Sequence, residues 1–219
     1  MIELIFISIL SYLLGSIPFS YLVARFFGKN LYEVGSKNIG AANVYRATGK
    51  AEATILALIG DVGKGGLAVA LAKGLACLGG YNPILGQALA AFFVVAGHNW
   101  PIFLKFKGGR GLASLAGVIL FLKWQVLILV LIVIGFFIFL TEFIMKKGIK
   151  LEGFGKEKIK SLISIFISQI LGRVIGMVAA VILVFLFYPE VFKIAFGAVI
   201  VTGAKHMKRT QSFLEQQKR

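Results

Sequence analysis

Long apolar runs separated by short polar segments dominate the 219-residue chain. A helix needs about 20 apolar residues to cross the hydrocarbon core of a bilayer. Segments of strand length with alternating polarity are absent, so the runs should be helices. The pattern predicts an all-α polytopic membrane protein. About seven transmembrane helices are expected, at residues 2–25, 53–78, 84–97, 112–121, 126–145, 161–187 and 191–204.

Three of these runs depart from a plain spanning helix. Pro18 should bend the first one. Residues 112–121 are too few for an ordinary span, and we expect a short helix that crosses obliquely. Residues 161–187 contain Arg173. Either residues 161–171 form an interfacial helix and the span starts at Arg173, or Arg173 lines a cavity; we favour the first arrangement.

Composition and charge then set the class and the orientation. Only 15% of the residues are charged, against about a quarter in a soluble domain, so we expect one transmembrane domain over residues 1–219. The net charge of +15 lies mostly between apolar runs, where cations orient the chain and touch anionic lipid headgroups rather than nucleic acid. Arg25 and Lys29 follow the first run. The N-terminus is therefore predicted outside and the C-terminus, after seven crossings, in the cytoplasm.

Several functional classes lack their usual residues. Cys77 is the only cysteine, which excludes an intramolecular disulfide and a cysteine metal site. There is no nucleophile elbow, no H-x-x-x-x-D motif and no carboxylate-rich or His-rich cluster, so we expect neither a metal nor a cofactor. The first apolar run is long and lacks a basic start, which indicates a span rather than a cleaved signal peptide.

The polar segment of residues 27–52 contains the stretch VGSKNIGAANVYRATGK. Ser36, Asn38 and Asn43 can form hydrogen bonds, Gly40 permits a close approach of the backbone, and Arg46 supplies charge. Such a segment could wrap an anion with backbone N–H groups and complete the cage with a guanidinium. An ordinary polar connector, with Gly and Asn chosen for turns, fits the same residues.

A second polar segment, residues 97–113, reads GHNWPIFLKFKGGRGLA. Gly108 and Gly109 are expected to expose their N–H groups, while Lys107 and Arg110 neutralise negative charge. A helix that starts near Gly111 would add its positive N-terminal dipole. The alternative is a basic loop that only obeys the positive-inside rule. Both segments are predicted on the cytoplasmic side, which favours one shared site.

Four further polar residues stand out. Asp61 and Lys64 lie three residues apart in the second run, on one helical face. They either brace the helix as an ion pair, which we favour, or face a wet cavity. His98 could be a hydrogen-bonded structural residue, which we favour, or a base. His206 follows the last run among cations and is a candidate to touch an anion.

Three motifs taken together resemble the signatures of a known family, the bacterial acyl-phosphate:glycerol-3-phosphate acyltransferases of the PlsY type. They are SKNIGAANVYRATGK at 36–50, DVGKGG at 61–66 and GHNWPIFLKFKGGRGLAS at 97–114. Order and spacing match over about residues 1–125, and a final segment with His206 extends the resemblance weakly.

The resemblance implies a seven-helix inner-membrane enzyme with a site that faces the cytoplasm. Such an enzyme transfers a fatty acyl group from acyl-phosphate to the sn-1 hydroxyl of glycerol 3-phosphate, without a metal or cofactor. The enzyme that makes acyl-phosphate is then a candidate partner. Carried over by position, the catalytic residues would be Ser36, Arg46 and Arg110. The residues that bind substrate would be Asn38, Gly40, Asn43, His98, Lys107, Gly108, Gly109 and His206.

The chain also departs from the family pattern. Lys37 replaces a usual Gly, Arg110 a usual Lys, and Arg209 stands where the closing motif has Asn. The lysine-rich segment 146–160 is longer than the usual connection. These departures leave open a paralogue with another acceptor. A second alternative is a transporter or binding protein for an organophosphate, which the charges of the second run would suit. The absence of an internal repeat argues against a transporter.

Overall fold

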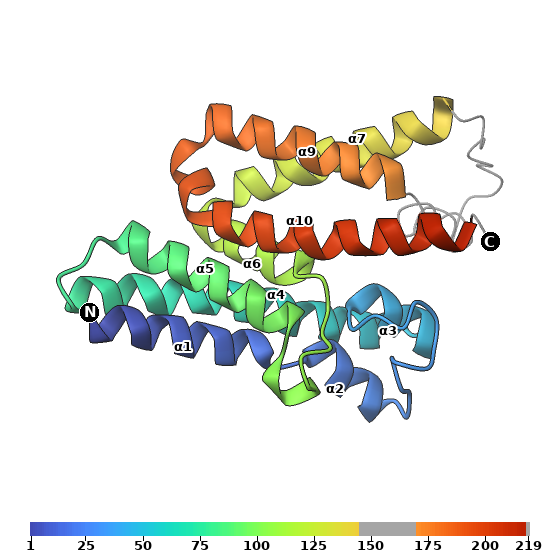
Figure 1. Cartoon of the computed structure of the whole chain (residues 1–219), viewed down its shortest axis with the longest axis horizontal. Coiled ribbons are helices and arrows are strands. Elements are labelled where there is room, and N and C mark those ends of the chain that lie inside the picture. The colour runs from blue at the N-terminus through green and yellow to red at the C-terminus, as the bar shows by residue number, and fades with distance from the viewer. Residues whose placement is uncertain (145–169, 218–219) are drawn as a thin grey trace. The chain divides into compact units, whose positions relative to one another are not determined.

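The computed structural model describes residues 1–144 and 170–217, all of them in helices, turns and connecting loops (Figure 1). The lysine-rich segment 146–160 lies outside the described residues, as do the side chains of Arg173 and Arg209. No strand occurs in the described part of the chain, so the predicted all-α class is confirmed. The helices are α1 (Ile2–Ser16), α2 (Phe19–Phe26), α3 (Ala41–Thr48), α4 (Ala51–Leu78), α5 (Pro83–Asn99), η1 (Ile102–Leu104), α6 (Leu112–Leu122), α7 (Trp124–Ile144), α9 (Ile170–Phe187) and α10 (Pro189–Gln217).

Four helical segments are long and apolar enough to cross a membrane: Ile2–Phe26, Ala51–Leu78, Pro83–Leu104 and Trp124–Thr141. Two shorter apolar helices accompany them, Leu112–Leu122 and Val174–Phe187. The polytopic character is therefore confirmed. The count of seven crossings and their direction stay predictions.

The chain forms two compact units, residues 1–123 with 193–219, and residues 124–192. In the first unit, α1, α4 and α5 lie side by side, and α6 packs against α4 (Figure 1). In the second unit, α7 and α9 form an antiparallel pair. There Gly172 and Gly176 of α9 lie directly against the backbone of Ile138 and Ile134 in α7.

Small residues set the distances between the helices of the first unit. An added Cβ at Gly15 of α1 would meet the Val94 carbonyl of α5, and one at Gly65 of α4 would meet the Ser114 carbonyl of α6. Gly117 of α6 faces α4 in the same way. In lipid, helices associate through such close backbone packing because no hydrophobic effect drives them together.

The first helix is broken rather than bent. α1 ends at Ser16, Ile17 is extended (φ −64°, ψ 114°), and α2 begins at Phe19. Pro18 lacks an N–H group and forces the preceding residue out of the helical region. The sequence predicted one bent helix, whereas the structure has two separate helices. The break gives α2 its own direction (Figure 1).

The segment of residues 27–52 was expected as a loop, but it contains the helix α3. α3 packs on α4 through a hydrophobic cluster of buried residues, here called the loop cluster: Ala24, Leu31, Ile39, Val44, Ala53 and Ala57. The helix predicted at 112–121 is present as α6. At the chain's end, α10 runs without interruption to Gln217, beyond the span predicted at 191–204.

Candidate active site

The first polar loop is held in shape by Asn43. This side chain is 1% exposed. Its Oδ1 accepts a hydrogen bond from the Ser36 N–H at 2.8 Å, and its Nδ2 donates to the carbonyls of Leu31 and Val34 at 3.2 and 3.1 Å. Three of the four hydrogen bonds that an amide can form are thus made within the loop. Asn43 acts here as a clamp, and the predicted contact with substrate has one position left to use.

Arg46 and Gly40 lie on either side of that clamp. The Cβ and Cδ of Arg46 pack against Gly35, which is left-handed at φ +60° and has no room for a side chain beside Asn43. Arg46 is an exposed residue. Gly40 is extended and caps α3, and the Asn38 side chain lies beside it. Ser36 and Asn38 are half-buried in the same loop.

The second polar loop turns sharply before its glycines. Lys105 and Phe106 are both left-handed, with φ of 51° and 62°. The Phe106 N–H donates to the Pro101 carbonyl at 2.9 Å, which closes the turn. Left-handed backbone costs about 1–2 kcal/mol for each residue that carries a Cβ. The turn leaves Lys107 exposed at the mouth of the glycine pair.

The two glycines are not equivalent, and one expectation needs correction. The Gly109 N–H donates to the His98 carbonyl at 3.0 Å, so it is not available to an anion. Gly109 is also buried, with no room for a Cβ between the His98 ring and the Ile39 carbonyl. Gly108 packs in the same tight way on the His98 carbonyl and Pro101. The expected exposure of the Gly109 N–H is therefore wrong, while a role of Gly109 in binding substrate stays a prediction.

The helix expected to start near Gly111 is α6, which begins at Leu112. Gly111 is its N-cap with φ +81°, a conformation that favours glycine. Its Cα lies against Val95, Asn99 and Thr202. The first N–H groups of α6 have no partner within the helix, and they follow directly on Arg110, which is half-buried.

The two loops are in contact, as their common side predicted. The Tyr32 hydroxyl donates to the Lys107 carbonyl at 2.7 Å, and Ile39 of the first loop touches Gly109 of the second. Leu104 packs on the loop cluster. Burial raises the pKa of Tyr32 above its usual range, which keeps the hydroxyl protonated as a donor. Residues of both loops therefore form one surface.

His98 lies beneath this surface, with one edge of its ring against Gly109 and the other toward Asp61. It is 7% exposed, and its Nδ1 lies 3.5 Å from Asp61 Oδ1. Asp61 pairs with Lys64 at 2.9 Å and accepts a hydrogen bond from the Ser20 hydroxyl at 2.6 Å. The ion pair that was expected to brace α4 is therefore present and buried. The predicted role of His98 as a ligand for substrate stays a prediction.

Lys205 of α10 and Asn99 at the end of α5 join the site, and neither was among the residues predicted for it. Lys205 donates to the Asn99 carbonyl at 3.0 Å and lies 4.8 Å from the centre of the Trp100 ring. The Asn99 side chain is fully buried and donates to the Val201 carbonyl at 3.4 Å. The position of Asn99 in the second polar segment, directly after His98, was its only signal in the sequence. His206, next to Lys205, is half-buried on α10.

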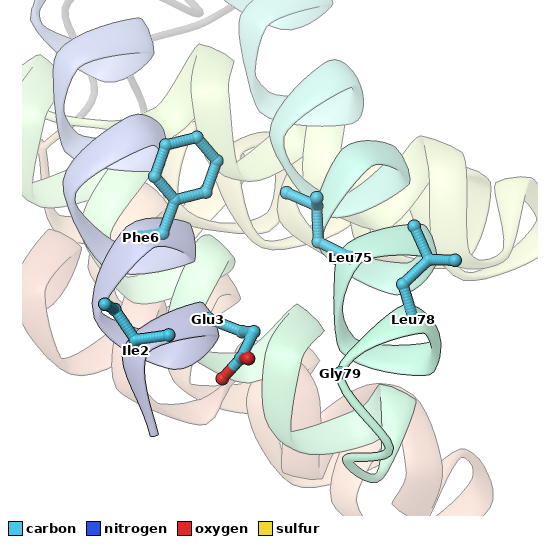
Figure 2. Close-up of a pocket in the computed structure, with 6 residues that line it drawn as sticks. All are labelled: Ile2, Glu3, Phe6, Leu75, Leu78 and Gly79. Atoms are coloured by element: carbon cyan, nitrogen blue, oxygen red, sulfur yellow. The ribbon is translucent and has the colours of Figure 1, made fainter.

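Two surface hollows lie away from the loops. One, of about 330 Å³, is lined by Ile2, Glu3 and Phe6 of α1 and by Leu75, Leu78 and Gly79 at the end of α4 (Figure 2). Figure 2 shows the Glu3 carboxylate pointing from α1 toward the turn at Gly79. The other, of about 480 Å³, is an apolar groove between α1 and α5. Among residues 1–144 and 170–217, no three His, Cys, Asp or Glu side chains are placed to hold a metal ion.

The fold and the loops define an integral membrane protein of helices with a basic, glycine-rich site where its helices end. Residues 5–155 match the model of the family described as glycerol-3-phosphate acyltransferase. A protein of that name from Wolbachia pipientis is 36% identical over 215 residues, 97% of this chain and 96% of its own length. A relative of the same name from Carboxydothermus hydrogenoformans is 42% identical over 68% of this chain and 70% of its own length. Another, from Jannaschia, is 46% identical over 54% of this chain and 56% of its own length.

A crystal structure described as PlsY, an integral membrane glycerol 3-phosphate acyltransferase in its glycerol 3-phosphate form, has the same fold. It is similar with a TM-score of 0.69 and 25% identity, over 98% of this chain and 91% of that one. The chain belongs to the glycerol-3-phosphate acyltransferase family. It is a membrane acyltransferase.

Proposed function

We propose that the enzyme transfers a fatty acyl group from acyl-phosphate to the sn-1 hydroxyl of glycerol 3-phosphate, giving lysophosphatidic acid and phosphate for phospholipid synthesis. Family membership supports the acceptor and the reaction type. The observation that carries the mechanism is the contact between two basic, glycine-rich loops, through Tyr32 and Lys107 and through Ile39 and Gly109. Each loop offers one phosphate a set of donors, and their contact brings two phosphates together.

The first loop would hold one phosphate through Ser36, Asn38 and Arg46. The second loop would hold the other through Lys107, Gly108 and Arg110, with the N-terminus of α6 behind them. Each charge-assisted hydrogen bond contributes about 1.5–3 kcal/mol. A guanidinium in place of the family's usual Lys permits a bidentate grip on two phosphate oxygens.

The chemistry then needs no base from the protein. The glycerol oxygen attacks the carbonyl carbon of the mixed anhydride, a C–O bond forms, and the bond from that carbon to the phosphate oxygen breaks. The hydroxyl proton passes to a phosphate of the substrates, and inorganic phosphate leaves. Positioning alone can lower such a barrier by about 7–11 kcal/mol, and the cations stabilise the charge that develops on oxygen.

The setting follows from the charge pattern. The cations of both loops support a site on the cytoplasmic side under the positive-inside rule, and the membrane would be the cell's inner membrane. Acyl-phosphate would reach the loops from the bilayer, and the enzyme that makes it would be a partner. The transporter alternative relied on charges at membrane depth. Asp61 and Lys64 satisfy each other as a buried pair, so that observation no longer favours transport.

The test uses purified protein in lipid with palmitoyl-phosphate and glycerol 3-phosphate. Equal release of phosphate and lysophosphatidic acid is expected, and none with acyl-CoA. Arg46→Ala and Arg110→Ala should each lower turnover about 100-fold or more, since each removes about 3 kcal/mol of charge-assisted binding in the transition state. Arg25→Ala, an exposed cation on α2, is the matched control and should remain active.

Three other results would change the assignment. Phosphate release without lysophosphatidic acid would mean a different acceptor. Full turnover in both loop variants would remove the two arginines from the site. Uptake of labelled glycerol 3-phosphate into vesicles without acylation would replace the enzyme by a transporter.

A further inference from the structure

Four polar side chains meet inside the helical core, next to the ends of α1 and α5. They are Ser20 of α2, Asp61 and Lys64 of α4 and His98 of α5, here called the Asp61 cluster. Their exposed fractions are 0%, 1%, 4% and 7%. Asp61 is the centre, since it touches the other three at 2.6, 2.9 and 3.5 Å.

One side of the cluster holds the break between α1 and α2. The Lys64 Nζ donates to the Ile17 carbonyl at 2.7 Å. This carbonyl lies just past the end of α1, where Pro18 interrupts the helix, so it lacks an intrahelical partner. The Ser20 hydroxyl, in the first turn of α2, donates to Asp61. The two charges of α4 thus fix the start of α2, which leads into the first loop.

The other side of the cluster holds the second loop. The His98 Nδ1 faces Asp61, while the opposite edge of the ring, Nε2 and Cδ2, packs against Gly109. The His98 carbonyl also accepts the Gly109 N–H at 3.0 Å. The orientation of one imidazole ring therefore fixes how closely Gly109 approaches Ile39 of the first loop.

Stability alone does not account for this cluster. Replacing a buried ion pair by apolar side chains of similar size is often neutral or stabilising. We propose that Asp61 and Lys64 are positioning residues, which hold the two loops in the register that acyl transfer requires. The proposal rests on the proposed function. It gives the DVGKGG motif at 61–66 a role in positioning the two loops. Asp61 acts on the loops only through Ser20 and His98.

Two double variants with the same charge separate positioning from bracing. The apolar pair, Asp61→Leu with Lys64→Met, removes both charges and every acceptor for Ser20 and His98. The amide pair, Asp61→Asn with Lys64→Met, removes both charges but keeps an oxygen that can accept from one of these two groups. Lys73→Met, at an exposed position of α4, is the matched control. Melting temperature, kcat and both KM values are measured for each.

We expect both pairs to melt within about 5 °C of the parent, because each removes the charges together. The apolar pair should lose about 100-fold in kcat, the cost of roughly a 1 Å misplacement, with each KM changed by less than about threefold. The kcat of the amide pair should be at least about tenfold higher than that of the apolar pair. Equal kcat values in the two pairs would overturn the proposal, as would failure of either pair to fold, since the cluster would then be a brace.

A second measurement reads the loop register without activity. Nitroxides are placed at Glu33→Cys and Ile102→Cys, two exposed positions of the two loops, in a Cys77→Ser background. The spin–spin distance distribution should broaden or shift in the apolar pair and stay as in the parent for Lys73→Met. An unchanged distribution in the apolar pair overturns the positioning role. A parent without acyl transfer refutes the proposed function instead, and the distances then still report on the cluster.

Discussion

Replacing Gly109 by alanine adds one methyl group where the two loops meet, and the structure sets the size of the effect. The new Cβ would overlap the Ile39 carbonyl and the His98 Nε2, and would lie 2.8 Å from the His98 Cδ2. Neither neighbour can yield easily, because one is backbone and the other is buried. Overpacking of this kind costs about 1–3 kcal/mol. The alternative to that strain is that the loops separate.

A separation of about 1 Å lowers the rate about 100-fold when positioning carries the chemistry. We therefore expect Gly109→Ala to lower kcat by about that factor. The melting temperature should fall by only about 2–12 °C, from 1–3 kcal/mol at roughly 2–4 °C for each. Release of phosphate and lysophosphatidic acid measures the first quantity, and thermal unfolding in lipid or detergent measures the second.

The control is Gly63→Ala on α4, where an added Cβ meets no heavy atom within 4 Å. It should keep the parent's turnover and melt no lower, since alanine favours a helix over glycine by about 1 kcal/mol. Parental turnover in Gly109→Ala would refute the reasoning, because the tight contact between the loops would then not set the rate.

Three further outcomes are expected. Gly65→Ala should lower the melting temperature, because its Cβ would overlap a carbonyl of α6, whereas Gly66→Ala, with a nearest contact of 3.4 Å, should leave it unchanged or raise it. Tyr32→Phe removes the 2.7 Å bond to Lys107 and should cost about 0.5–1.5 kcal/mol in unfolding titrations. Burial raises the pKa of Tyr32, so its contribution to stability is complete below about pH 10, the ordinary Tyr value, and is lost as pH rises through the raised one; the phenylalanine variant should lack that loss. In Lys37→Gly, glycine replaces a left-handed residue at φ 53°. The folded state should become more stable by about 0.5–1 kcal/mol, because the relieved backbone strain of roughly 1–2 kcal/mol exceeds the entropic cost of glycine. Unfolding that is easier than in the parent would contradict this.

The sequence was sufficient for the parts that depend on composition. Apolar length located α4 and α5 within a few residues, because lipid imposes a minimum span. It did not locate α3. That helix has only eight residues, and its apolar side chains meet a core built from α2 and α4, which a local pattern does not contain. The break at Pro18 was also underestimated, since Lys64 stabilises the freed Ile17 carbonyl from 47 residues away.

The candidate site shows the same limit at the level of single groups. Residue type identified which groups of the two loops can donate, but not which are used by the fold itself. Asn43 gives three of its hydrogen bonds to its own loop, and Gly109 gives its N–H to His98. Lys205 and Asn99 entered the site only through the packing of α10. Partners that are distant in sequence decide these assignments.

Strain in the backbone connects these details to the reaction. In the part of the chain that the structure describes, three residues other than glycine have positive φ, and they are Lys37, Lys105 and Phe106. All three lie in the two loops, although each costs about 1–2 kcal/mol there. Such residues persist only where their surroundings over-determine them, and here Asn43 and Tyr32 supply that constraint. A reaction that needs no base from the protein gains its rate from fixed positions, so rigid, strained loops are what this chemistry requires.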